Sequence, residues 1–131
     1  TKDFRTGSWQ GYQDKDVVAI VNLGAEKTVT TVEVNFLQDQ RSWIFYPTEV
    51  YCYTSTDNQN YQLATSQKID ATKASEETTI KTIQFDLNNK NVQYVKIVAK
   101  KLGKLPKWHL GSANDGRSWI FVDEIAVGSR Q

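Results

Sequence analysis

The 131-residue chain contains one cysteine, one histidine and no methionine, and each scarcity excludes a class of site. The lone Cys52 excludes an internal disulfide, and its place in the apolar run EVYCYTS predicts a buried thiol. The lone His109 excludes a histidine-based metal cluster, and any Ser-His-Asp or Cys-His scheme would depend on this one residue. The sequence also lacks a glycine-rich phosphate loop and zinc-type cysteine spacing. We therefore predict that the chain is not an enzyme by itself.

The sequence has no excess of one charge, because 16 lysines and arginines are balanced by 15 aspartates and glutamates. The most basic stretch, KIVAKKLGKLPK, alternates like a strand and predicts a solvated face rather than a phosphate site. This balance predicts no nucleic-acid partner. No apolar run is long enough to cross a bilayer, so we predict no membrane insertion. The chain lacks a signal peptide and does not begin with methionine, which predicts a module excised from a longer protein.

Strand patterns, by contrast, recur along the whole chain. In VTTVEVNFL, for example, Val32, Val34 and Phe36 alternate with polar residues. Turn-rich stretches such as TDNQN, NNKN and SANDG separate these patterns, and the polar DATKASEETT predicts a surface loop. The sequence therefore predicts one domain over residues 1–131, an all-β antiparallel sandwich of the jelly-roll type with about eight strands. Strands are expected at residues 17–24, 29–37, 48–55, 61–68, 79–87, 93–102 and 119–127.

The pentapeptide RSWIF occurs twice, at residues 41–45 and 117–121, each time where a loop enters a strand. In an extended chain its Arg, Trp and Phe fall on one face, and its Ser and Ile on the other. Large aromatic residues close the open end of a sandwich well. We therefore expect the rings of both copies to pack beneath the loops, with two walls of one binding site as the alternative. The rings are those of Trp43, Phe45, Trp119 and Phe121.

Three blocks of sequence, in order, carry a family resemblance over nearly the whole chain. They are GSWQGYQDKDVVAIVNLG, TVEVNFLQDQRSWIFYPTEVYCYTSTDNQNY and YVKIVAKKLGKLPKWHLGSANDGRSWIFVDEIAV. Together they resemble a discoidin-type module, also called the coagulation-factor 5/8 type C domain. More closely, they resemble the family 32 carbohydrate-binding modules appended to bacterial β-N-acetylhexosaminidases (chitobiases) and related glycosidases. The resemblance implies a galactose-binding-domain-like jelly roll, with sugar binding by the loops at one end of the sandwich.

The same resemblance implies a setting for the chain. The module would be secreted, periplasmic or on the bacterial cell surface, and its partner in cis would be a parent catalytic domain. Its ligands would be glycans of the galactose or N-acetylhexosamine type. It also implies a structural calcium, for which Glu124 stands at the family position whose carboxylate reaches the ion, with loop carbonyls near Asp3 and Thr6. Calcium needs six or more oxygens, so Glu124 as a surface partner of a lysine is the alternative.

The loop GKLPKWHLGSANDG supplies the leading candidates for sugar contact. A tryptophan among glycine, proline and asparagine has few neighbours to bury it, and a sugar ring offers C–H bonds that stack on an indole. We predict that Trp108 stacks in this way and that His109 exchanges a hydrogen bond with an adjacent hydroxyl. The alternative is that Trp108 packs over the end of the sheet and His109 is merely exposed.

Arg41 and Arg117 lie on the loop side of the two RSWIF copies and are predicted to project toward one rim. A guanidinium offers a rigid fork of donors for vicinal hydroxyls or an acetamido carbonyl, while a salt bridge to Asp39 or Asp115 is the alternative. Other hydrogen-bonding groups on the same loops are predicted as ligand contacts or, alternatively, as ordinary turn residues. They are Gln38, Asn114 and Asp115.

Three functions therefore remain open at this stage. The first is a non-catalytic carbohydrate-binding module that holds a glycosidase on glycan-bearing material. The second is a structural module that packs against its parent enzyme without binding sugar. The third is a discoidin-like adhesion domain for protein or phospholipid, for which the segment KLGKLPKW offers the one basic and apolar loop.

Overall fold

The computed structural model of the chain describes residues 2–6, 10–114 and 116–130, and it describes residues 2–6, 10, 113, 114, 123, 124 and 130 by their backbone alone. The described residues form seven strands and two short 3₁₀ helices. The strands are β1 (Lys2–Thr6), β2 (Gln10–Gln13), β3 (Val17–Gln38), β4 (Glu49–Ser55), β5 (Gln62–Lys68), β6 (Thr79–Lys100) and β7 (Trp119–Arg130). The helices are η1 (Gln40–Ser42) and η2 (Leu110–Asn114).

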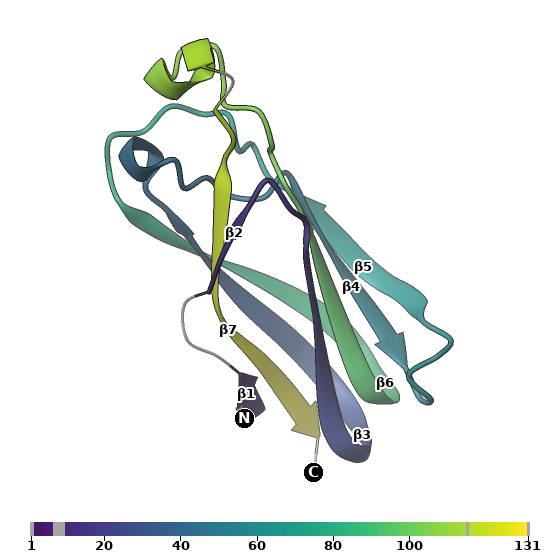
Figure 1. Ribbon diagram of the computed structural model, residues 1–131. Coiled ribbons are helices and arrows are strands. Elements are labelled where there is room, and N and C mark those ends of the chain that lie inside the picture. The colour runs from purple at the N-terminus through teal and green to yellow at the C-terminus, as the bar shows by residue number, and fades with distance from the viewer. Residues whose placement is uncertain (1, 7–9, 115, 131) are drawn as a thin grey trace.

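The strands form one antiparallel sheet that curls into a two-layered sandwich (Figure 1). Its order is β1-β7-β3-β6-β4-β5, and β2 pairs with β7 beside this path. The sequence prediction of an all-β antiparallel fold is confirmed. The predicted loop at DATKASEETT is also found, because no strand or helix lies between β5 and β6 in the part of the chain that the structure describes.

The curl comes from β3 and β6, which are 22 residues each and pair along almost their whole length. Each strand bends where its backbone takes a positive φ, at Gly24 (82°) in β3 and at Asn88 (55°) and Asn89 (62°) in β6. The second half of β3 pairs with β7 in one layer, and the second half of β6 pairs with β4 in the other. The sequence predicts the halves as separate strands because turn residues interrupt the apolar pattern, whereas the backbone pairing of β3 with β6 resumes in a shifted register beyond each bend.

The inward side chains of the two layers make a single core. Val32, Val34 and Phe36 of β3 are fully buried, and so are Ile83 and Phe85 of β6. The two-residue alternation read from the sequence therefore describes both strands correctly, because alternate side chains of a strand point to opposite faces.

Cys52 of β4 belongs to this core and is fully buried, as its apolar setting predicts. Burial disfavours the thiolate and raises the pKa of the Cys52 thiol to about 12. We expect a disulfide reagent to leave the native protein unlabelled near pH 8, under conditions that label the urea-unfolded chain stoichiometrically. Equal labelling rates for the native and unfolded protein would contradict this expectation and would show that β4 opens locally.

The two RSWIF copies lie side by side and are joined by backbone hydrogen bonds. The amide of Trp119 donates to the carbonyl of Trp43 (2.8 Å), and the amide of Phe45 donates to the carbonyl of Trp119 (3.0 Å). The prediction of an extended conformation is wrong for the first copy, because η1 occupies its start and Trp43 adopts a left-handed conformation (φ 66°). Phe45 is fully buried and closes the end of the sandwich as expected.

In the second copy the packing is the reverse of the prediction. Ser118 and Ile120 point into the protein, each 1% exposed, whereas Trp119 and Phe121 are half-buried, with their ring centroids 6.0 Å apart. These two rings pack over Gly11 of β2, where an added side-chain carbon would lie 2.7 Å from the Phe121 ring. The smaller residues of this copy thus face inward, and β2 can approach its rings because it presents a glycine.

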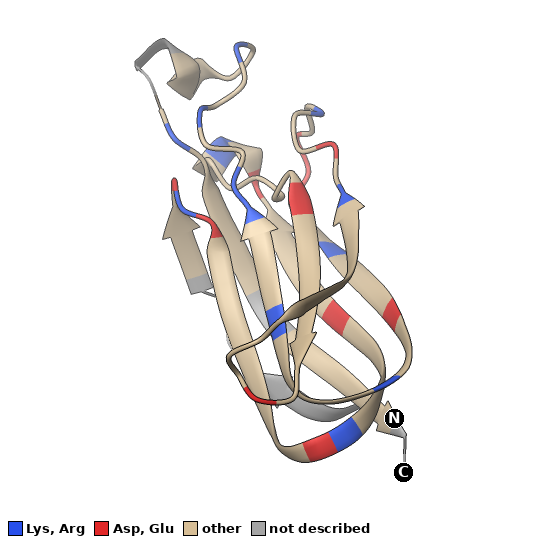
Figure 2. Ribbon diagram, turned by 90° about the vertical axis from the view of Figure 1, so that its right-hand side faces the viewer, with Lys and Arg blue, Asp and Glu red and all other residues tan. Residues whose placement is uncertain are grey.

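The connections are divided between the two ends of the molecule. η1, η2 and residues 69–78, 101–114 and 116–118 gather at one end, called the loop end below, while the β4–β5 turn, the two bends, β1 and the end of β7 lie at the other (Figure 1). Lysine, arginine, aspartate and glutamate are interspersed over the strands and loops (Figure 2). Among the described residues, no helix has the length and apolar character needed to cross a membrane.

Candidate functional site

A cavity of about 500 Å³ opens at the loop end between three segments that are far apart in the sequence. The first is η1 with the residue that ends it, the second lies between β5 and β6, and the third leads into β7. The lining combines two indoles and aliphatic groups with one cation and one anion. It consists of Gln40, Arg41, Trp43, Ala74, Ser75, Glu76, Trp108, His109 and Leu110.

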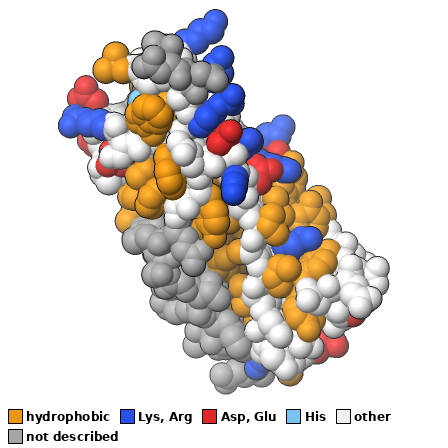
Figure 3. All heavy atoms as spheres, in the orientation of Figure 1, with side chains coloured by type: hydrophobic (Ala, Val, Ile, Leu, Met, Phe, Trp, Pro, Cys, Tyr) orange, Lys and Arg blue, Asp and Glu red, His pale blue; other side chains and the backbone are white. Residues whose placement is uncertain are grey.

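Trp108 is held by its indole N–H and by the neighbouring rings of Phe45 and His109, yet 48% of it is exposed. Its indole N–H donates to the carbonyl of Thr72 (3.1 Å), and its ring centroid lies 6.1 Å from that of the buried Phe45. Hydrophobic side chains gather at this end of the surface, beside the histidine (Figure 3). The indole is therefore fixed in orientation before a ligand arrives, which lowers the entropy cost of stacking against it.

His109 has both ring nitrogens engaged within the protein. Its Nδ1 accepts a hydrogen bond from the amide of Gly111 (3.0 Å), and its Nε2 lies 2.6 Å from the carbonyl oxygen of Gln40. Because Nδ1 accepts, Nε2 carries the proton and donates it to that carbonyl. Neither nitrogen is free for the predicted bond to a sugar hydroxyl, so we revise the role of His109 to a brace between η1 and the Trp108 loop.

Gln40 connects the other two segments. The side chain is 4% exposed, and its Nε2 donates to the carbonyl of Lys73 (2.7 Å) and to Oε1 of Gln38 (3.1 Å). Its Oε1 accepts a hydrogen bond from the amide of Ser75 (2.8 Å). The buried side-chain amide of Gln40 therefore satisfies a backbone carbonyl and a backbone amide of the 69–78 connection. The backbone carbonyl of Gln40 accepts the hydrogen bond from His109.

Residues 101–114 and 116–118 belong to a loop that is closed by backbone hydrogen bonds and packed against Trp43. The amide of Leu105 donates to the carbonyl of Gly116, and the amide of Gly116 donates to the carbonyl of Gly111, each at 3.0 Å. A side-chain carbon added at Gly111 would lie 2.8 Å from the Trp43 ring, and one at Gly116 would lie 2.6 Å from the Gly111 carbonyl oxygen. Glycine is needed at both positions because the backbone touches the indole and itself.

The structure separates the two arginines that the sequence places at one rim. Arg41 lines the cavity from η1 and is exposed. Arg117 is not part of the lining, and its Nε lies 3.9 Å from Oδ2 of Asp14. Of the two arginines, Arg41 lines this cavity, and a ligand contact by Arg117 stays a prediction.

Gln38 also falls outside the lining. It is buried, and its Oε1 accepts the hydrogen bond from Gln40. A ligand contact by Gln38 stays a prediction. Asn114 belongs to η2 at the loop end, but its side chain lies outside the described residues, as does the whole of Asp115. A ligand contact by Asn114 or Asp115 stays a prediction.

The connection between β5 and β6 contributes residues to the cavity that were not predicted from the sequence. Ser75 and Glu76 of the polar stretch DATKASEETT line the cavity opposite Trp108, and no periodicity in that stretch indicates it. Among the described residues, neither Glu76 nor Arg41 has a hydrogen-bond or ion-pair partner. The cavity therefore offers one free carboxylate and one free guanidinium beside an open indole.

The family model for the F5/8 type C domain matches residues 2–125. The chain belongs to the F5/8 type C domain family. No curated protein sequence matches this F5/8 type C domain significantly.

Solved structures share the fold of this F5/8 type C domain at low sequence identity. The module CpGH89CBM32-5 from Clostridium perfringens, in complex with GalNAc-β-1,3-galactose, has a TM-score of 0.57 at 15% identity, over 94% of this chain and 76% of that one. Chitosan-binding module 1 of a chitosanase/glucanase from Paenibacillus sp. IK-5 has a TM-score of 0.53 at 15% identity, over 94% and 74%.

A fragment of a putative chitobiase from Bacteroides thetaiotaomicron has a TM-score of 0.57 at 16% identity. The match covers 89% of this F5/8 type C domain and 62% of the fragment, so the chain spans less than two thirds of that relative. Identities this low establish the shared sandwich and leave the ligand to be argued from the residues of the loop end.

The calcium expected of an F5/8 type C domain depends on residues whose side chains the structure does not describe, namely Glu124, Asp3 and Thr6. Among the side chains that it does describe, no group of three or more histidines, cysteines, aspartates or glutamates is placed to hold a metal ion. Calcium at Glu124 stays a prediction.

Proposed function

We propose that the chain is a non-catalytic carbohydrate-binding module and that the cavity at the loop end binds one sugar residue. The observation that carries the proposal is the half-exposed indole of Trp108, which is fixed by Thr72 and Phe45 and faces a cavity with an unpaired Arg41 and Glu76. A flat aromatic face binds the C–H side of a pyranose, while charged groups bind its hydroxyls.

The polar groups support a galactose or N-acetylhexosamine ligand. The guanidinium of Arg41 can donate two parallel hydrogen bonds to vicinal hydroxyls or to an acetamido carbonyl, and the carboxylate of Glu76 can accept from a hydroxyl. Ala74 and Leu110 add aliphatic surface to the lining, which suits an acetamido methyl group. Among the solved relatives, CpGH89CBM32-5 binds GalNAc-β-1,3-galactose.

The position of the cavity supports a role beside a catalytic domain. Both ends of the chain lie away from the loop end, so a domain attached at either one leaves the cavity open (Figure 1). A shallow site with one stacking ring binds weakly, and attachment to a secreted bacterial glycosidase would turn that weak affinity into a raised local concentration of substrate.

Titration of the chain with galactose, N-acetylgalactosamine and N-acetylglucosamine tests the proposal. We expect saturable binding of at least one of them, with a Kd on the order of 1 mM, by calorimetry and by a change in tryptophan fluorescence. Absence of saturable binding for all three sugars, with the protein folded by circular dichroism, would contradict the proposal.

A further inference from the structure

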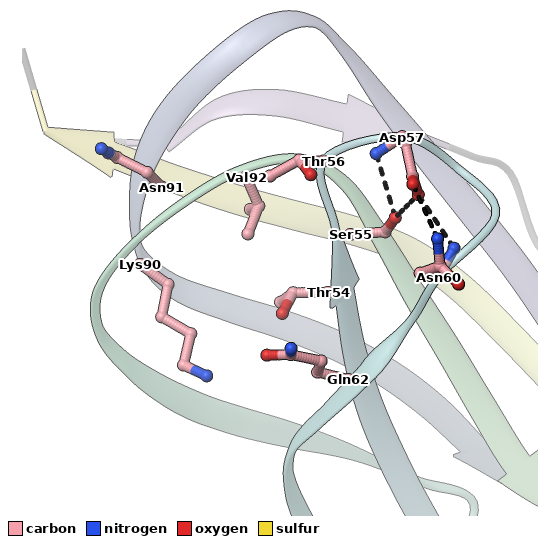
Figure 4. Close-up of a pocket in the computed structure, with 9 residues that line it drawn as sticks. All are labelled: Thr54, Ser55, Thr56, Asp57, Asn60, Gln62, Lys90, Asn91 and Val92. Carbon is pink, nitrogen blue, oxygen red and sulfur yellow. Dashed lines mark hydrogen bonds between the residues drawn. The ribbon is translucent and has the colours of Figure 1, made fainter.

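A second cavity, of about 340 Å³, lies at the end of the sandwich opposite the loop end (Figure 4). The end of β4, the β4–β5 turn, the start of β5 and the bend of β6 enclose it. Thr54, Gln62, Lys90 and Asn91 supply polar groups to its lining, and Val92 supplies aliphatic surface. Its size admits a single sugar residue, and its lining contains no aromatic side chain.

The wall formed by the β4–β5 turn is rigid, because Asp57 organises it. The Asp57 carboxylate accepts hydrogen bonds from Ser55 Oγ (2.9 Å), from the amides of Gln59 (2.9 Å) and Asn60 (2.8 Å), and from Asn60 Nδ2 (2.9 Å). These bonds, led by those from the two amides, hold the pKa of Asp57 well below its ordinary value. The Asp57 carboxylate therefore makes its hydrogen bonds within the turn, and these four donors offset the negative charge that it presents to the cavity.

The donors on the other side of the cavity are unengaged. Figure 4 shows the side chains of Thr54, Gln62 and Lys90 directed toward one another across the cavity. Among the described residues, none of these three side chains has a hydrogen-bond or ion-pair partner. These three groups converge and can each donate a hydrogen bond, and one of them is a cation. What they lack is an acceptor.

Thr54 is the most informative of the three, because it is only 3% exposed. A buried hydroxyl normally has a partner. No fully buried side-chain nitrogen or oxygen of the described residues lacks one, so the Thr54 hydroxyl must be reachable from the cavity. The cavity thus contains a sheltered hydroxyl beside a lysine, an arrangement suited to one carboxylate oxygen.

We propose that this cavity is a second ligand site and that it binds a hexuronate, a sugar residue that bears a carboxylate. The ligand carboxylate would accept from the Lys90 ammonium and the Thr54 hydroxyl, and a ring hydroxyl would bond to the amide of Gln62. Lys90 is the one cation of the lining, and the one carboxylate of the lining, Asp57, has its charge offset by its four donors. One cation matches one negative charge, whereas a phosphate dianion calls for more than one. The inference does not rest on the proposed function, because it concerns other residues at the other end of the molecule.

The test is a titration of the Trp108→Ala variant of the full chain, followed by the amide shifts of its nuclear magnetic resonance spectrum. We expect D-galacturonate to shift the amides of residues 54, 62 and 90–92 saturably, with a Kd on the order of a few mM. D-Galactose and acetate should bind at least ten-fold more weakly, because each lacks one half of the ligand. Since Lys90 is exposed, affinity should also fall with added salt.

Two substitutions, made in the same background, locate the site. Lys90→Gln should weaken D-galacturonate at least ten-fold and Thr54→Val about three-fold, while Lys15→Gln, an equal charge change in the β2–β3 turn, should leave the affinity unchanged. The proposal would be overturned if acetate or D-galactose bound as tightly as D-galacturonate. It would also be overturned if Lys90→Gln and Lys15→Gln lost equal affinity, or if the amide shifts were confined to the loop end. Binding in the Trp108→Ala background separates this result from any failure of the sugar cavity at the loop end.

Discussion

Replacing Trp108 by alanine is expected to remove measurable sugar binding at the loop end while the protein stays folded. The change deletes the half-exposed aromatic face of the cavity, and truncation of such a central ring commonly costs about 2 kcal/mol or more. A loss of about 2 kcal/mol is a factor of about 30 in Kd, which moves a millimolar ligand beyond calorimetric detection. The Thr72 carbonyl that loses its donor belongs to an exposed residue and can bond to water.

The Trp108 experiment has two comparison variants. Trp108→Phe keeps an aromatic face but loses the N–H that holds it to Thr72, so we expect an intermediate affinity. Leu63→Ala removes an equally exposed apolar side chain from β5, outside the cavity, and should leave the affinity unchanged. Undiminished binding by Trp108→Ala would remove this cavity as the sugar site.

Replacing Gln40 by leucine is expected to lower both stability and sugar affinity. Leucine fills the buried space but leaves the Ser75 amide, the Lys73 carbonyl and Gln38 Oε1 without their partners. Gln38 Oε1 is buried and the two backbone groups are part-buried. A buried polar group that loses its partner costs about 1 to 3 kcal/mol and part-buried ones cost less, so we expect a total loss of roughly 3 kcal/mol in the free energy of unfolding. In a domain of this size that is a fall of about 10 °C in Tm.

The sugar affinity should fall as well. Ser75 and Glu76 line the cavity, and the 69–78 connection that holds them there loses its hydrogen bonds to Gln40 in the variant. Thermal unfolding and sugar titration of the same variant measure both effects. Gln59→Leu makes the same chemical change at an exposed turn position and should shift stability by less than about 0.5 kcal/mol. A destabilised Gln40→Leu protein with unchanged affinity would show that the 69–78 connection does not contribute to binding.

Much of the fold could be predicted because strand alternation is a local property. The buried faces of β3 and β6 follow directly from the spacing of Val32, Val34, Ile83 and Phe85. The continuity of those strands around their bends could not be read, because it depends on backbone pairing between residues such as Thr28 and Asn91. The same limit explains the first RSWIF copy, in which η1 replaces the extended chain that periodicity predicts.

The candidate site could be predicted in part, for a related physical reason. Residue type and loop composition indicated Trp108 and Arg41, since an aromatic or a guanidinium in a turn-rich loop has few ways of being buried. The roles of Gln40 and His109 depend on hydrogen bonds between segments that are distant in sequence, and spacing along the chain does not encode them. Glu76 was not predicted as a site residue, because the polar sequence around it is typical of any surface loop.

The two backbone bonds between the copies of RSWIF join positions that are 76 and 74 residues apart. During synthesis from the N-terminus, Trp43 and Phe45 emerge long before Trp119, to which they are hydrogen-bonded. Contacts of such long sequence separation form late and slow the folding of β proteins. An incomplete nascent chain would therefore expose Trp43 and Phe45 without a recognition surface, and the module would gain its binding capacity only once its last strand has joined the sheet.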